Sequence, residues 1–397
     1  NHPGCGGSHL PDVTLIAPVR DESGQGLGYV AVRAHHAEIG GSRPGSTPPF
    51  ASTLEEEGVI IPPMLLVSDG KERFEDVQHV LEHARFPSRK CEENIADLRA
   101  QLASIRHGAS RLEDLAGTIG TKDFLRLSET VRARAADSAR RAVRTMGVLQ
   151  KTVEQHLDDG TTIRLELSSD GETMKLDFSG TSPRHDANFN APIAITLGAT
   201  VYLMRLLANE SLPMNEGLLD PVEIHVPDCF LNPKFTGDAA RDPAVCAGNT
   251  ETSQRVTDTL LLAFELAACS QGTMNNLLFG DDSFGYYETI AGGSGATAHA
   301  AGTDAVHTHM TNTRITDPET LEARYPVALE RFEIRRGSGG EGRNPGGHGV
   351  IRSLRARRTL EFSFIGQHRR ESPYGLNGGH AGLVGRQYID RADGERI

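Results

Sequence analysis

The stretch HLPDVTLIAPVRDESGQGLGYVAVRAHHAE, residues 9–38, holds two apolar runs separated by a polar segment. Residues 13–16 and 29–32 are alternating or β-branched, a composition typical of strands. Residues 21–26, DESGQG, have the composition of a turn. The stretch therefore predicts an antiparallel β-hairpin near the start of the chain.

The open end of this hairpin gathers imidazole and carboxylate groups. With the turn centred near residues 23–24, Asp12 falls opposite His35, and directly opposed residues lie roughly 4.5–5.5 Å apart at Cβ. His9 can join them only if the chain bends between His9 and Asp12. Pro11 disfavours a helix there, and the flanking glycines favour a bend. Two histidines and one carboxylate with open positions suit Zn, Mn or Fe and leave room for a water. The alternative is that these are polar loop residues that cap a hairpin.

The middle of the chain predicts helices followed by a second hairpin. Ile95, Leu98, Leu102 and Ile105 recur at helical spacing, and a second helix is expected over residues 122–144. We interpret the arginines of that second helix as a solvated or partner-facing surface. A hairpin over residues 162–178 and a deeply buried helix over residues 193–208 are expected next.

The last hundred residues predict strands over 332–335, 350–354 and 360–364, joined by glycine-rich turns. The fold class is therefore α+β, with an N-terminal β-hairpin, central helices and a glycine-rich, β-rich C-terminal region. We expect four regions that form one intertwined unit, with these bounds: 1–90, 91–160, 161–330 and 331–397.

Several shorter segments carry weaker expectations. Residues 55–58, EEEG, are interpreted as a solvated acidic turn, and residues 60–67 as a strand with a Pro-Pro interruption. In AGNTETS, residues 247–253, Asn249 or Thr250 is expected to cap the start of a helix. This helix start could hold a carboxylate or oxyanion; the alternative is that it has a structural role alone.

The sequence HTH, residues 307–309, places both imidazole rings on one face if it lies on a strand. This is compatible with contact to a metal or a substrate.

Composition limits the classes of function. The net charge of −12 argues against nucleic acid or an anionic membrane as a partner. Five scattered cysteines without a CxxC pair favour a reducing, cytoplasmic compartment. No apolar run approaches the roughly 20 residues of a membrane span, and no signal peptide or GxxxxGK phosphate loop occurs. The chain begins without Met, so residues beyond either end are expected.

Long motifs along the whole chain resemble the hydantoinase B/5-oxoprolinase family, with the closest likeness to its 5-oxoprolinase branch. The matching segments are GGSHLPDVTLIAPV (6–19), RAHHAEIGGSRPGSTPP (33–49), ENIADLRAQLA (93–103), AGNTETSQRVTD (247–258), SQGTMNNLLFG (270–280), YYETIAGGSGA (286–296), HTHMTNTRITDPE (307–319) and ERFEIRRGSGGEGRNPGGHGVIR (330–352).

The resemblance implies an ATP-dependent enzyme that opens cyclic amides such as 5-oxoproline, hydantoins or lactams. It implies that ATP and Mg are bound by a hydantoinase A-type ATPase partner in a hetero-oligomer, while this chain completes hydrolysis of the phosphorylated intermediate. The alternatives are a subunit of an acetone- or acetophenone-type carboxylase and a non-catalytic scaffold for the ATPase.

The resemblance also implies a divalent metal (Zn, Mn or Fe) on His9, Asp12 and His35, with His36 as the alternative to His35. Asp12 or Glu38 would orient a histidine ligand if it is not itself a ligand. A further acidic ligand is expected from a segment before Asn1. Two departures from the family pattern stand at His2 and Glu38, where the family usually has Asp. The implied catalytic residues are His9, Asp12, Glu251 and His307, and the implied substrate-binding residues are Asn249, Thr252, His309 and Asn312.

Overall fold

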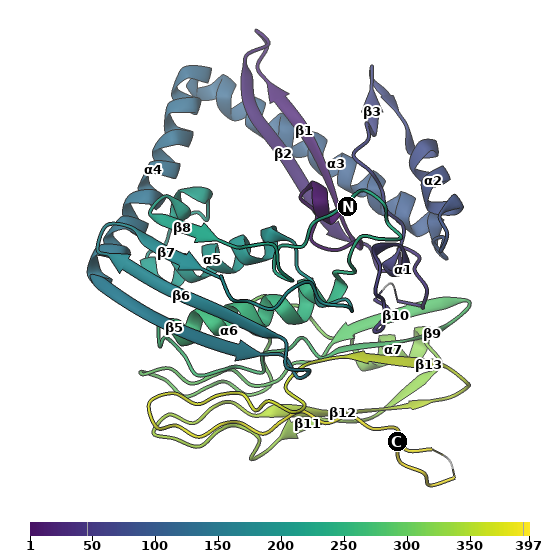
Figure 1. Ribbon diagram of the computed structural model, residues 1–397. Coiled ribbons are helices and arrows are strands. Elements are labelled where there is room, and N and C mark those ends of the chain that lie inside the picture. The colour runs from purple at the N-terminus through teal and green to yellow at the C-terminus, as the bar shows by residue number, and fades with distance from the viewer. Residues whose placement is uncertain (46, 392) are drawn as a thin grey trace.

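The computed structural model describes residues 1–45, 47–391 and 393–397, and it has the α+β architecture that the sequence predicts. The N-terminal hairpin and its helices lie at one end of the molecule, and the C-terminal strands β11 and β12 lie at the other (Figure 1). Between them stands a four-stranded sheet covered by two helices. Among the described residues, no helix has both the length and the apolar character needed to cross a bilayer.

The predicted hairpin is confirmed, with longer strands than expected. Strand β1 (Asp12–Arg20) pairs antiparallel with β2 (Gly26–His35), and the register sets Asp12 opposite His35. Asp21 forms the turn, because its Oδ1 accepts hydrogen bonds from the backbone N–H groups of Ser23 and Gln25. The short helix η1 (Pro3–Cys5) precedes the hairpin.

Three helices support this hairpin: α2 (Phe74–His83), α3 (Cys91–Ile119) and α4 (Thr121–Met146). The apolar stripe predicted on α3 is confirmed, since all four of its members are buried. The arginines of α4 are exposed and pair with acidic side chains, as the pair of Arg132 with Asp220 at 2.7 Å illustrates. Such exposed pairs stabilise little, so the α4 surface is a solvated one.

The largest core lies between the central sheet and two helices. The sheet has the order β5-β6-β7-β8, and its predicted hairpin β6–β7 is only half of it. Helix α5 covers the sheet together with α6, and the core includes Leu165, Leu203 and Leu260. The bounds are β5 (Val148–His156), β6 (Thr162–Asp170), β7 (Met174–Asp177), β8 (Val222–His225), α5 (Ile193–Ala208), α6 (Ser253–Ala263) and the short helix η2 (Glu216–Leu219).

The C-terminal part contains the three predicted strands in two separate sheets. One sheet has the order β10-β9-β13, and the other is the pair β11-β12. A cluster of aromatic rings around Phe279 fills the space between the first sheet and α7. The bounds are β9 (Asn276–Asp281), β10 (Phe284–Thr289), α7 (Pro318–Arg324), β11 (Val327–Arg335), β12 (Gly349–Ala356) and β13 (Glu361–Ile365).

Two local predictions are wrong. Residues 60–66 are not a strand, and only β3 (Val67–Ser68) pairs, with β4 (Lys71–Glu72). The acidic segment is not a solvated turn, because α1 (Leu54–Glu57) buries Glu57 completely. Both carboxylate oxygens of Glu57 accept backbone N–H bonds from residues 245 and 246, at 2.9 and 2.7 Å. Burial raises the pKa of Glu57 to about 8 in spite of these two bonds.

Candidate metal centre

The chain bends immediately before β1, and this bend brings His9 to the hairpin. The backbone N–H of Asp12 donates to the carbonyl of His9 at 3.1 Å, which closes a tight turn across Pro11. Gly7 makes the approach possible, because a Cβ there would lie 2.3 Å from the carbonyl oxygen of Asn1. The predicted bend is therefore present, and it is made by local backbone geometry.

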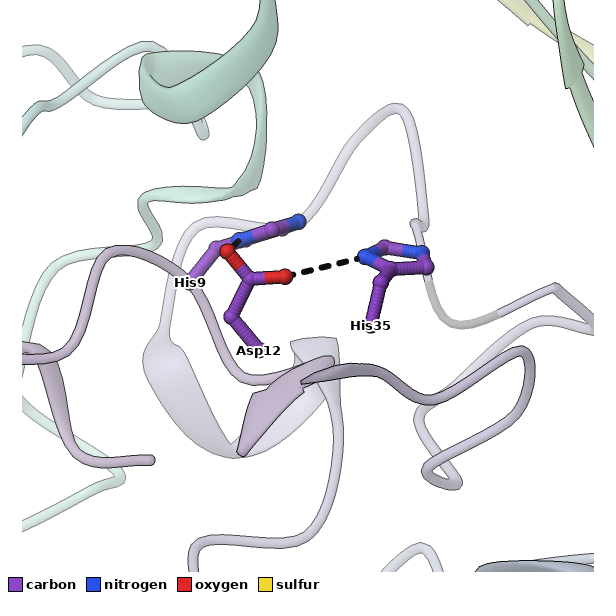
Figure 2. Close-up of side chains that lie close together, drawn as sticks. All are labelled: His9, Asp12 and His35. Carbon is purple, nitrogen blue, oxygen red and sulfur yellow. Dashed lines mark hydrogen bonds and ion pairs between the residues drawn. The ribbon is translucent and has the colours of Figure 1, made fainter. Parts of the chain in front are cut away.

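Asp12 stands between two imidazole rings (Figure 2). Its Oδ1 lies 3.1 Å from His35 Nδ1, and its Oδ2 lies 3.4 Å from His9 Nδ1. The centroids of the two rings are 5.3 Å apart. One potential ligand atom from each of the three residues lies within 4.8 Å of the other two. Two imidazole nitrogens and one carboxylate oxygen form a donor set that fits a divalent transition metal.

The electrostatics of the group favour the protonation states that bind metal. Burial lowers the pKa of His9, which keeps its ring neutral. Burial alone would raise the pKa of Asp12, but hydrogen bonds from His35 and His9 outweigh it and hold this pKa well below its usual range. Ser8 adds a further bond, its hydroxyl donating to Asp12 Oδ2 at 2.8 Å.

The group is closed on one side and open on the other. The side chain of His9 is 4% exposed and that of Asp12 is 17% exposed, whereas that of His35 is 42% exposed. A water or a small substrate can therefore approach from the side of His35. This is the arrangement expected of a catalytic rather than a structural metal site.

The structure separates His36 from the group. Its ring is buried, with Nδ1 2.7 Å from Asn94 Oδ1 and Nε2 3.2 Å from Gln101 Oε1. Both amides belong to α3, so His36 fastens the end of β2 to that helix. Of the two neighbouring histidines, His35 is the one brought to Asp12.

Glu38 also faces away from the two rings. It is buried, and its oxygens accept bonds from the backbone of Gly40 and Arg89 and from the hydroxyl of Ser88. The expectation that Glu38 orients a histidine ligand is therefore wrong. It holds the chain at the start of α3.

Comparison with known proteins places the chain in a family. The model of the family described as hydantoinase B/oxoprolinase matches residues 1–396. The chain belongs to the hydantoinase B/oxoprolinase family. It is 42% identical over 425 residues to 5-oxoprolinase 1 of Arabidopsis thaliana, a match that covers 100% of this chain and 33% of that protein. The chain thus spans about a third of the length of such curated relatives.

Two solved structures share the fold of this hydantoinase B/oxoprolinase chain. An ATP-dependent caprolactamase from Pseudomonas jessenii has a TM-score of 0.80 at 20% identity, with 96% of this chain and 72% of that chain covered. Acetone carboxylase in its nucleotide-free structure has a TM-score of 0.79 at 19% identity, with coverage of 95% and 54%. At these identities the likeness concerns the fold alone.

The predicted residues near 250 lie on an unusual turn of this family member. Residues Gly248–Thr252 form a π-helical turn, η3, that leads into α6. The prediction of an Asn249 or Thr250 cap is therefore wrong, because the helix continues from this turn and Ala247 precedes it without a side-chain cap. Turns of this type are frequent at functional sites.

Asn249 reaches the ring of His9 from this turn. Its Nδ2 lies 3.5 Å from His9 Nε2. Thr252 instead bonds inward, with its hydroxyl donating to the carbonyl of Phe189 at 2.7 Å.

Glu251 is buried, and hydrogen bonds connect it through Asn276 to Tyr287, whose ring lies near His35. Glu251 Oε1 accepts from Asn276 Nδ2 at 2.7 Å, and Tyr287 Oη donates to Asn276 Oδ1 at 2.8 Å. The ring of Tyr287 lies 5.8 Å from that of His35, centroid to centroid. Burial raises the pKa of Glu251, and its Oε2 has no hydrogen-bond partner among the described residues. The sequence contained the motif around Tyr287 but no signal for this contact.

The segment with His307 and His309 is not a strand, so the prediction that both rings share one strand face is wrong. His309 has a left-handed backbone, with φ of 56°, which turns its ring inward. Its Nδ1 lies 3.1 Å from Tyr202 Oη, and its Nε2 lies 3.0 Å from Ser270 Oγ. Burial lowers the pKa of both histidines, that of His309 to about 4. Asn312 is exposed.

Proposed function

We propose that this chain is the metal-bearing part of an ATP-dependent cyclic-amide hydrolase of the 5-oxoprolinase type. The observation that carries the proposal is the group of His9, Asp12 and His35, which presents three metal-ligand atoms beside an open face. The 42% identity to a named 5-oxoprolinase over the whole chain supports the class of reaction. A cytoplasmic location and a hydantoinase A-type ATPase partner that binds ATP and Mg belong to the same proposal.

The division of labour follows from amide chemistry. An amide carbonyl is a poor electrophile because resonance with nitrogen reduces its reactivity. Transfer of a phosphoryl group to the carbonyl oxygen, carried out by the partner, makes that oxygen a leaving group. The reaction that is left for this chain starts with attack of water on the activated carbon and breaking of its bond to nitrogen, which opens the ring and leaves an acyl phosphate. A second water then attacks the acyl carbon and releases phosphate.

His9, Asp12 and His35 would hold the divalent metal, which when bound supplies a water of lowered pKa and polarises the bound oxygen. Asp12 keeps its negative charge at neutral pH and fixes the orientation of both rings. His9 stays neutral, so its nitrogen lone pair is free for a ligand bond. The exposed side of His35 is where the substrate approaches.

Glu251 and Asn249 are the nearest candidates for handling the substrate. Glu251 is buried, burial raises its pKa, and its Oε2 has no hydrogen-bond partner among the described residues. A proton on this carboxyl would be donated to the ring nitrogen as it leaves. Asn249 offers its amide N–H group at the edge of His9. His307, His309, Thr252 and Asn312 stay predicted contributors from the surrounding loops.

The test is reconstitution with the ATPase partner. We expect ATP-dependent conversion of 5-oxoproline to glutamate, and its loss in a folded His9→Ala/Asp12→Ala variant that still assembles with the partner. His36→Gln is the matched control and should retain turnover. Product formation that requires bicarbonate would instead favour a carboxylase function, since acetone carboxylase has the same fold. Full activity of the double variant would favour the scaffold.

A further inference from the structure

A second cluster of ligand-type side chains lies in the interior of the protein. Asp258 stands on α6, Cys269 lies in the segment that follows α6, and His368 comes shortly after β13. Their exposed fractions are 0%, 7% and 2%. One potential ligand atom from each residue lies within 4.8 Å of the other two, and Cys269 Sγ is 3.6 Å from His368 Nε2.

The ring of His368 is oriented so that its free nitrogen faces the cluster. Its Nδ1 lies 2.6 Å from the carbonyl oxygen of Glu371, which can only accept a hydrogen bond. Nδ1 therefore carries the proton, and the lone pair of Nε2 is directed at Cys269. Metal-binding histidines are held in this way, with one ring nitrogen donating to a carbonyl and the other on the metal.

The backbone leaves space at the point where these atoms converge. Gly272 has φ of +60°, and a Cβ there would lie 2.2 Å from His368 Nε2 and 2.8 Å from Asp258 Oδ2. Any side chain at this position would collide with two of the three ligand atoms. Only glycine keeps the approach to them clear.

Asp258 lacks the partners that a buried carboxylate needs. Within the part of the chain that the structure describes, neither of its oxygens has a nitrogen or hydroxyl hydrogen-bond donor, and the thiol of Cys269 is the one donor directed at it. Burial raises the pKa of Asp258 to about 7 and raises that of Cys269 well above its usual value. Buried polar groups without partners are rare in folded proteins, and an unplaced ion is one of the recognised explanations.

We propose that Asp258, Cys269 and His368 bind a zinc-type divalent metal at a second site, separate from the His9 centre. Tetrahedral zinc, with bonds of about 2.3 Å to sulfur and about 2.0–2.1 Å to nitrogen, sets these two ligand atoms about 3.6 Å apart. The observed distance between Cys269 Sγ and His368 Nε2 has this value. A thiolate ligand selects zinc over the hard cations calcium and magnesium.

The charges of the ligands and the presence of a fourth ligand candidate nearby also fit a metal. Binding displaces the thiol proton of Cys269 to solvent, so that one thiolate and one carboxylate neutralise the divalent ion. The buried guanidinium of Arg255 acts on both acidic groups and favours their charged forms. His309 Nε2 lies 3.9 Å from Asp258 Oδ1 and is the neighbouring candidate for the fourth ligand.

Complete burial makes this a structural site that the metal enters as the chain folds. The metal would tie the segment after β13 to α6 and to the segment that follows α6. Cys269 and His368 are 99 residues apart in the sequence. The segment after β13 also supplies Tyr374, whose hydroxyl donates to the backbone carbonyl of Asp258 at 2.8 Å.

The two centres can be told apart by cobalt, because the His9 centre contains no sulfur. The protein is produced in minimal medium with Co²⁺ as the added transition metal, and its near-ultraviolet absorption is recorded. We expect a thiolate-to-cobalt charge-transfer band in the wild type. The band should persist in His9→Ala/Asp12→Ala, disappear in Cys269→Ser, and persist in Cys229→Ser, which alters another buried thiol.

A folded wild type without the band overturns the proposal, and so does a band that survives Cys269→Ser. A second measurement needs no variant. X-ray absorption of the zinc-loaded wild type should contain a zinc–sulfur distance of about 2.3 Å, and a spectrum with nitrogen and oxygen scatterers only would contradict the site.

Discussion

Asp12 stands directly across the hairpin from His35, and its two carboxylate oxygens lie against different histidine rings, His35 on one side and His9 on the other. This relationship is set by two local features, the register of β1 with β2 and the bend at Pro11. It places a charged carboxylate between ring nitrogens of the two histidines.

Replacing Asp12 by Asn removes the charge and keeps the shape. Because mutation of outer-shell partners costs about 10–100-fold in metal affinity, loss of this direct ligand should weaken binding by more than about 100-fold. Competition with a chelator measures the affinity. Asp282→Asn, an exposed change in the turn between β9 and β10, is the control and should leave it unaltered. Equal affinities in the two variants would exclude Asp12 as a ligand.

The two neighbouring histidines should separate metal binding from stability. His35→Ala should abolish binding at this centre with a small effect on stability, since its side chain is 42% exposed. His36→Ala should keep the metal and lower the free energy of unfolding by about 1–3 kcal/mol, because the buried side-chain oxygens of Asn94 and Gln101 lose their contacts with the ring. Urea denaturation and elemental analysis give both quantities. The reverse pattern would move the ligand role to His36.

Gly248 is required by the π-helical turn that carries Asn249. A Cβ at this position would lie 1.8 Å from the carbonyl oxygen of Asn190, so Gly248→Ala should destabilise the fold by about 3 kcal/mol. Gly198→Ala is the matched control in α5, where a Cβ meets nothing within 4 Å. That change should stabilise the protein by roughly 0.5–1 kcal/mol. Thermal unfolding of the two variants measures this difference in stability. Similar melting temperatures would contradict the packing of η3.

Stability should fall as the pH rises from about 6.5 to 8. The pKa of Glu57 is raised to about 8 in the fold, above the ordinary glutamate value of 4.5, so the folded state binds a proton that the unfolded state has released. The free energy of unfolding then decreases with pH, by roughly 1.4 kcal/mol per unit for one such group.

Glu57→Gln should reduce the dependence of the free energy of unfolding on pH, whether the variant is more or less stable than the wild type. Urea denaturation at several pH values measures this dependence. His9 and Asp12, whose pKa values are lowered, bind fewer protons in the fold than in the unfolded chain, so their effect has the opposite sign and fades above the ordinary histidine pKa of about 6.5. Parallel curves for the variant and the wild type would show that Glu57 is charged in the fold.

The sequence predicted what local patterns determine. The hairpin register followed from strand periodicity and one turn, and therefore Asp12 and His35 were placed correctly. The helix α3 followed from apolar spacing, and α4 and α5 followed from composition. The prediction that α5 is deeply buried is wrong on one face, where Ile193 is 36% and Leu206 is 44% exposed. Family motifs pointed to the same residues.

Interactions between distant segments could not be predicted. His36 depends on Gln101, 65 residues away, and Glu57 depends on backbone groups 188 and 189 residues away. The spacing of Asp258, Cys269 and His368 resembles no metal motif, because three separate segments supply one residue each. The HTH segment has the alternation of a strand, but the left-handed backbone at His309 interrupts the extended conformation that a strand needs.

The most direct test of the central claim is elemental mass spectrometry of the purified protein, comparing the wild type with folded His9→Ala/Asp12→Ala and with His36→Gln. We expect the double variant to lose one transition metal per chain relative to the wild type, and His36→Gln to retain the wild-type content. A metal that is bound at the buried cysteine site would stay in all three. An unchanged metal content in the double variant would contradict the His9 centre.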